Sequence, residues 1–117
     1  MLDRADRLHR QFFRPAMLYA RKMAWEPPVD IYETDSDITI TVALPGVEAV
    51  QISIELDGNQ LIIGGQRQLP TRVAAHIRRL EIPYGRFERH IDLPTAKLDI
   101  TGREFVNGCL SITLQKR

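Results

Sequence analysis

The sequence has few of the residues from which catalytic and metal sites are built. Its 117 residues include one cysteine, Cys109, so no intramolecular disulfide can form, which favours a reducing compartment. The three histidines are scattered along the chain, at His9, His76 and His90. None has a cysteine or carboxylate at the spacing of metal ligands, and there is no phosphate-binding Gly-rich loop and no G-x-S-x-G elbow. We therefore predict a protein that is not an enzyme and uses no cofactor or metal.

Long hydrophobic runs are also missing. No segment approaches the ~18 apolar residues of a membrane span, and charged residues such as Asp3 and Arg4 interrupt the N-terminus where a secretory signal would be apolar. The net charge of +1 gives no strong field that would attract nucleic acid or an anionic membrane. We expect a cytoplasmic protein without nucleic-acid, membrane or small-molecule partners.

The first 25 residues differ from the rest of the chain. They carry six Arg or Lys against two Asp, a net charge of +4, whereas the remainder has a net charge of −3. Leu2, Ala5, Leu8 and Phe12 recur at a helix-like spacing, and Pro15 ends or kinks such a helix. We predict an N-terminal arm over residues 1–25 that is partly helical or disordered, followed by one domain over residues 26–117.

From Val29 onward the pattern is that of β-strands. Apolar and polar residues alternate over 38–44, 50–56 and 109–114, which is typical of strands with one buried face. Asp57-Gly58-Asn59 and Asn107-Gly108 are hairpin turns by composition. About seven short strands, separated by turns, predict an all-β fold, an antiparallel immunoglobulin-like sandwich. The return strand that begins at Leu61 should weaken at Gly64-Gly65. Residues 66–85 are irregular, although 75–82 could hold one short strand.

Five segments in order resemble the alpha-crystallin domain of small heat-shock proteins. They are W-E-P-P-V-D-I-Y-E (25–33), A-L-P-G-V (43–47), L-I-I-G-G-Q-R (61–67), G-R-F-E-R-H-I-D-L-P (85–94) and N-G-C-L-S-I-T-L-Q-K (107–116). The chain departs from the family pattern at Gln66, where Glu is usual, at Gln115, where Pro is usual, and at Arg103, where a small residue is common. The resemblance implies an alpha-crystallin-type sandwich and an ATP-independent chaperone, a holdase that binds non-native proteins under stress. An alternative is a protein-interaction module like the CS-domain co-chaperones, without holdase activity.

The resemblance also implies a homodimer formed by strand exchange, or a larger homo-oligomer. In the family the irregular segment projects and adds a strand to the partner's sheet, and the arginine of the G-x-F-x-R strand lies at the interface. The corresponding interface residues here are His76, Ile77, Arg78, Leu80 and Arg89. Two alternatives remain open: residues 66–85 could be a plain surface loop, and Arg89 could extend from the sheet margin to water.

Two further surfaces follow from the resemblance. The strand 50–56 and the segment 98–105 should flank one edge of the sandwich, where family members bind an I-x-I tail; its residues here are Ile52, Ile54, Leu98 and Ile100. Ile52 and Ile54 could equally be core residues. The only I-x-I spacings, 38–40 and 52–54, lie inside expected strands, which predicts either small assemblies or a natural chain that continues beyond Arg117.

The arm supplies apolar side chains suited to loosely specified contacts with unfolding client proteins. These client-binding residues are Phe12, Phe13, Met17, Leu18, Tyr19 and Met23. Alternatives for the arm are a helix folded back over the sandwich and an amphipathic helix on a membrane surface.

Overall fold

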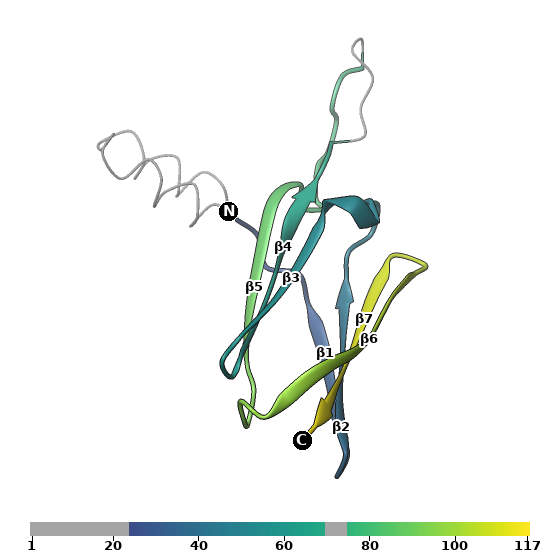
Figure 1. The fold of residues 1–117 in the computed structure, drawn as a ribbon. Helices are drawn as coiled ribbons and strands as arrows, with labels where there is room; N and C mark the ends of the chain where they lie inside the picture. The colour runs from purple at the N-terminus through teal and green to yellow at the C-terminus, as the bar shows by residue number, and fades with distance from the viewer. Residues whose placement is uncertain (1–23, 70–74) are drawn as a thin grey trace, which may run out of the picture.

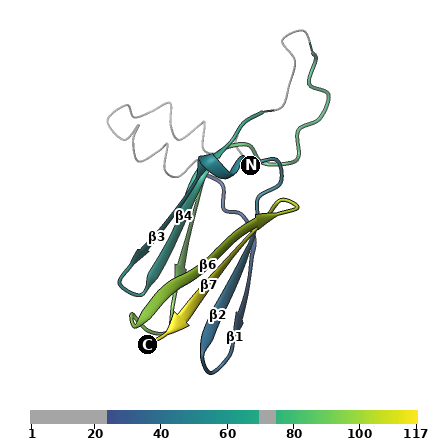
Figure 2. The same ribbon diagram turned by 45° about the vertical axis from the view of Figure 1, so that its right-hand side comes forward.

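The computed structural model describes residues 24–69 and 75–117, so the client-binding residues expected in the arm, which end at Met23, lie outside the described part. It contains seven strands: β1 (Val29–Glu33), β2 (Asp37–Ala43), β3 (Ile52–Asp57), β4 (Gln60–Arg67), β5 (Gly85–Asp92), β6 (Leu98–Val106) and β7 (Cys109–Lys116). They form a four-stranded sheet, β1-β2-β7-β6, and a three-stranded sheet, β3-β4-β5, in which every pairing is antiparallel. The two sheets face each other (Figures 1 and 2). The predicted antiparallel sandwich is confirmed.

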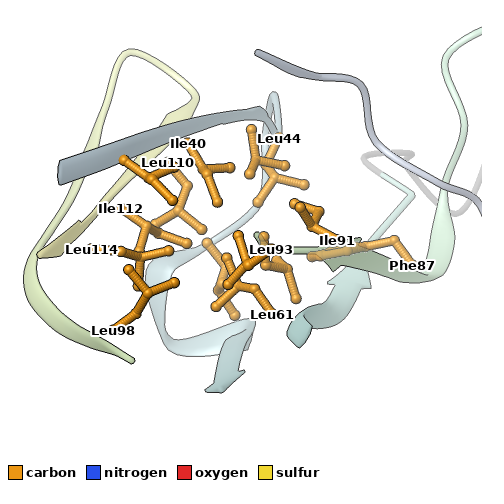
Figure 3. Close-up of a cluster of buried hydrophobic side chains, with 14 of the residues drawn as sticks. Ile40, Leu44, Leu61, Phe87, Ile91, Leu93, Leu98, Leu110, Ile112 and Leu114 are labelled. Carbon is orange, nitrogen blue, oxygen red and sulfur yellow. The ribbon is translucent and has the colours of Figure 1, made fainter. Parts of the chain in front are cut away.

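The core fills the space between the two sheets, as Figure 3 shows. In β2 the burial alternates strictly, and the inward residue Ile40 lies opposite Ile112 of β7. From the other sheet, Leu61 of β4 and Phe87 of β5 point into the same cluster and are also fully buried. Each such side chain contributes about 1.5–3 kcal/mol of burial free energy. Burial of the apolar residues at every second strand position therefore stabilises the packing of the two sheets.

The turn chemistry is also as predicted. Asn107 and Gly108 join β6 to β7 with φ angles of 54° and 76°, as a two-residue type I′ turn requires. Gly58 has a φ of 63° at the first position of the β3–β4 hairpin loop. These turns fix the register of both hairpins, so that Val106 lies opposite Cys109 and Asp57 opposite Gln60.

Val50 and Ile31 are large apolar residues that are exposed, and Val50 lies in the segment 50–56 that was expected to have one buried face. Val50 is 85% exposed because Ala49–Gln51 form a 3-10 turn, closed by the Gln51 N–H donating to Glu48 O, and β3 begins only at Ile52. Ile31 lies opposite the buried Ile40 but is 49% exposed. It is on β1, the edge strand of the wider sheet, where cover by the other sheet is incomplete.

The expected weakening of the return strand at Gly64-Gly65 is wrong, because β4 continues through both glycines to Arg67. At Gly65 a Cβ would lie 2.6 Å from Cζ of Phe87 and would also collide with the carbonyl oxygen of Gln51. The glycine therefore allows the neighbouring backbone and the Phe87 ring to approach β4 closely, rather than interrupting the strand.

Candidate functional site

The candidate interaction surfaces are the sheet edges, because an edge strand has unpaired N–H and C=O groups that can bind another chain. The edge strands are β1 and β6 in one sheet and β3 and β5 in the other. The four edges differ in which residues cover them, and this cover determines whether another chain can bind there.

The edge of β5 is partly covered by the segment that leads into β1. The Trp25 N–H donates to Arg86 O and the Glu88 N–H donates to Trp25 O, each at 3.1 Å. The Trp25 indole donates to Gly85 O at 3.2 Å, and its ring lies 5.3 Å from the Phe87 ring, centroid to centroid. The expected domain boundary placed Trp25 in the arm, but its contacts belong to the sandwich.

Arg89 holds the same segment. Its Nη1 donates to Pro27 O at 3.1 Å, two residues before β1 begins, and the side chain is partly buried. The guanidinium is therefore satisfied by a carbonyl of its own chain. It does not contact the described residues of the projecting segment, so its role at a subunit interface stays a prediction.

Arg67 is a buried charged residue that the sequence pattern did not single out. It is 8% exposed; its Nε donates to Pro45 O at 2.7 Å and its Nη1 to Pro83 O at 3.2 Å. Gly46, with a φ of 75°, leaves room for the guanidinium beside the 45–46 turn. Since Arg67 ends β4 and Pro83 lies just before β5, this side chain ties both ends of the intervening segment to the sandwich. The sequence signal that could have identified Arg67 is the motif L-I-I-G-G-Q-R, which resembles the family pattern and ends at this residue.

Residues 75–84, the described part of the chain that leads into β5, extend away from the sandwich in both views (Figures 1 and 2). This segment forms no strand within the single chain. Apolar side chains on it are exposed, including Ile77 at 54% and Leu80 at 44%. The structure places His76, Ile77, Arg78 and Leu80 on one exposed segment. This exposure fits both strand exchange and a plain surface loop, so their role in a dimer stays a prediction.

The edge of β1 is open. This strand pairs only with β2, and its residues Ile31 and Tyr32 are exposed. Among the described residues, no second strand pairs with it. An extended segment from another chain could bind here through main-chain hydrogen bonds.

The edges β3 and β6 contain the four residues expected to line a groove. Ile52 and Leu98 are buried core residues, Ile54 is partly buried against the core, and Ile100 is 40% exposed. The open alternative is thus settled for Ile52, which belongs to the core. The two strands do not pair, but Arg103 Nη2 on β6 lies 3.5 Å from Ile52 O on β3. Only Ile54 and Ile100 of the four can contact a ligand without rearrangement.

A polar ladder occupies the outer face of β4 and β5. His90 Nε2 lies 2.5 Å from Glu88 Oε2, and Arg86 donates to Glu88 Oε1 at 2.6 Å. The hydrogen bond from His90, with the positive charge of Arg86, lowers the pKa of Glu88 despite some desolvation. The His90 ring also contacts Gln60 across the strands at 3.2 Å. These groups bond to one another, which is typical of a solvated sheet face.

The described ranges of the chain are residues 24–69 and 75–117. No group of three or more His, Cys, Asp or Glu side chains in these ranges could hold a metal ion. Within the same ranges, no helix is long and apolar enough to cross a membrane. Cys109 is exposed at the start of β7.

The fold defines the class of protein. Two antiparallel sheets of four and three strands, with a segment that pairs beside β5 before it enters β1, form an alpha-crystallin-type sandwich. Comparison with known proteins agrees: the sequence profile of the Hsp20/alpha crystallin family matches residues 30–117. The chain belongs to this family.

Similar proteins are found among bacteria. The chain is 38% identical over 95 residues to small heat shock protein C2 of Rickettsia felis and 33% identical over 92 residues to a probable 15 kDa heat shock protein of Leptospira interrogans. Each match covers 78% of this chain, but 60% of the first relative and 70% of the second. The hspA structure from Xanthomonas axonopodis is 34% identical with a TM-score of 0.70, covering 80% of this chain and 95% of that one. Membership of this family supports a chaperone role.

Proposed function

We propose that this protein is an ATP-independent holdase that acts in the cytoplasm, binding non-native proteins and suppressing their aggregation under stress. Its membership of the Hsp20/alpha crystallin family is the observation that carries the proposal. The sandwich supports it physically, since it presents open strand edges and exposed apolar side chains such as Ile77 and Ile100. Such surfaces can cover the apolar segments that an unfolding client exposes.

The working unit is a homodimer formed by strand exchange. Residues His76 to Leu80 of one subunit pair with the edge of β1 in its partner, and the exchange is reciprocal about a twofold axis. Three observations support this arrangement: the segment is exposed, Arg67 anchors its base, and the β1 edge is open. Arg89 contributes at this interface by holding Pro27, which leads directly into β1.

Clients bind to the N-terminal arm and to the edge formed by β3 and β6. The arm residues, whose placement lies outside the described part, are Phe12, Phe13, Met17, Leu18, Tyr19 and Met23. Each contact is weak, and several subunits acting on one client supply avidity. The positive charge of the arm, +4 over residues 1–25, steers acidic clients toward it.

The test is an aggregation assay with a purified, heat-labile enzyme as client, followed by light scattering without ATP. We expect scattering to fall as the protein is added, to near zero when it is in several-fold molar excess. Serum albumin at equal mass is the control for non-specific crowding. If the client precipitates as fast as in buffer alone and sedimentation finds a monomer, the protein is instead an interaction module of the CS-domain kind.

A further inference from the structure

The inner face of β6 carries one charged side chain among apolar ones. Arg103 lies opposite Ile112 of β7, which is fully buried, and directly opposed residues share a face. Ile100 and Phe105 are on this face as well. A register shift between Ile100 and Gly102 explains how Ile100 and Arg103, three positions apart, come to the same side. By this register Arg103 lies between two apolar side chains on the face turned toward the other sheet, at the sheet edge, where the residue itself is exposed to solvent.

The guanidinium of Arg103 has spare hydrogen-bonding capacity. Its one contact with β3, to Ile52 O at 3.5 Å, is at the long limit for a hydrogen bond. Among the described residues it makes no ion pair with a carboxylate. The side chains of β3 on the facing side, Ile54 and Leu56, are apolar and only partly buried. This edge thus presents apolar surface around an unpaired cation.

We propose that the edge formed by β3 and β6 binds an extended segment of a partner protein that has a carboxylate on the same face as its aliphatic side chains, and that Arg103 selects it. The inference rests on the proposed role of this edge in binding. Aliphatic side chains fill the space beside Ile54 and Ile100, and main-chain groups pair with an open strand edge. The carboxylate accepts the N–H groups that Arg103 leaves unused, in a fork geometry that suits arginine.

Two labelled peptides that differ in one residue test the selection by fluorescence anisotropy. Both have two aliphatic residues spaced two apart, followed two positions later by Glu in one peptide and by Gln in the other. We expect the Glu peptide to bind about two- to fivefold more tightly, as for an exposed ion pair. This ratio should shrink as salt is added.

Variants of the protein test whether Arg103 causes the preference for the Glu peptide. Arg103→Gln should bind both peptides equally, at the affinity that the Gln peptide has for the unaltered protein, and Arg103→Lys should keep part of the preference. The matched control is Arg86→Gln, because Arg86 is an exposed arginine on the outer face of β5, paired with Glu88. This control should keep the full preference. Thermal unfolding of each variant shows that the fold is retained.

The outcomes separate this inference from the proposed function. If both peptides bind with equal affinity, or if Arg103→Gln keeps the preference, Arg103 does not select and the inference is wrong. If neither peptide binds, the edge is not a binding site and the inference falls with it, while holdase activity in the aggregation assay is judged independently. If the Glu peptide binds only by dissociating an assembly of the protein, the occupant is a second copy of this chain and the proposed partner is wrong.

Discussion

At the scale of single residues, Arg67 illustrates how a buried charge can be tolerated. It is the one charged side chain that is buried in the described part of the chain. Removing a guanidinium from water is costly unless hydrogen bonds replace the lost hydration. The carbonyls of Pro45 and Pro83 accept two such bonds, and neither proline offers an N–H of its own to a competing arrangement.

Replacing Arg67 with Met should lower the free energy of unfolding by about 2–4 kcal/mol, because two partly buried carbonyls lose charged donors. Arg67→Lys should fall between, since an ammonium lacks the planar fork. Urea unfolding followed by circular dichroism measures both. Arg79→Met is the control: Arg79 makes an ion pair with Glu81 in which the two side chains are 80% and 71% exposed. A similar loss in the Arg79 variant would contradict a specific role for Arg67.

The alternation of apolar residues predicted most of the core, and it failed where two distant parts of the chain meet. Ile38, Ile40 and Val42 are buried as expected. Arg67 shares the parity of the buried Leu61 and could have been suspected of facing inward. Its partners could not, because the carbonyls that satisfy it are 16 and 22 positions away in sequence. A local sequence pattern contains no information on contacts between segments that lie so far apart in the chain.

At the scale of elements, the neighbours of each edge strand indicate which sheet edges can bind another chain. The edge of β5 is occupied by Trp25 at residues 86–88, and β3 and β6 lie on the same side of the sandwich, bridged by Arg103. On its side away from β2, the edge of β1 is open among the described residues, and it is the edge proposed for strand exchange, whereas the β3 and β6 edges are the ones proposed to bind clients. Residues 75–84 form no strand in the single chain, as expected if the hydrogen-bond partners of this segment belong to the second molecule of the proposed dimer. The sequence alone therefore indicated the segment but not its state.

Ile77→Pro should convert the dimer to a monomer, because proline removes a main-chain N–H from the exchanged strand. Sedimentation velocity measures the change. The matched control is Ile82→Pro, since Ile82 is equally exposed at 54% but lies outside the strand expected over 76–80. The control should remain a dimer. If both variants dissociate, rigidity of the whole segment rather than strand pairing governs assembly, and a dimeric Ile77→Pro would rule out the exchange.

The ladder on β5 makes a small pH-dependent contribution to stability. Because the pKa of Glu88 is lower in the folded protein than in the unfolded chain, its contribution is present above the unfolded value and is lost as the pH falls through the folded one. Glu88→Gln should therefore lower stability near neutral pH, by at most about 1 kcal/mol for such partly exposed pairs. The difference should shrink as the pH falls below the ordinary pKa of glutamate and vanish below the lowered pKa of Glu88. Thermal unfolding across this range tests it, and a constant difference at all pH values would contradict it.

At the scale of the whole molecule, the sandwich and the arm differ in composition and in charge. The sandwich buries its apolar residues in the core and offers only narrow apolar strips at its edges, such as that beside Ile100. The arm has a higher density of aromatic and Met residues than the rest of the chain and the opposite net charge. Trp25 fixes the point where the two meet, against β5 and close to the start of β1. A ligand-binding arm would thus begin beside the proposed dimer interface.

Deleting residues 1–24 should separate the two parts, because Trp25 and its hydrogen bonds to β5 are retained. We expect the shortened protein to remain dimeric by sedimentation and to lose most of its suppression of client aggregation. A second variant keeps the arm but changes its six apolar residues to Ser, and it should show the same loss if contact area rather than charge binds clients. Should the serine variant stay active while the deletion does not, the positive charge of the arm is the main attraction. Full activity of the deletion would instead place client binding on the sandwich edges, where the strip beside Arg103 becomes the first surface to alter.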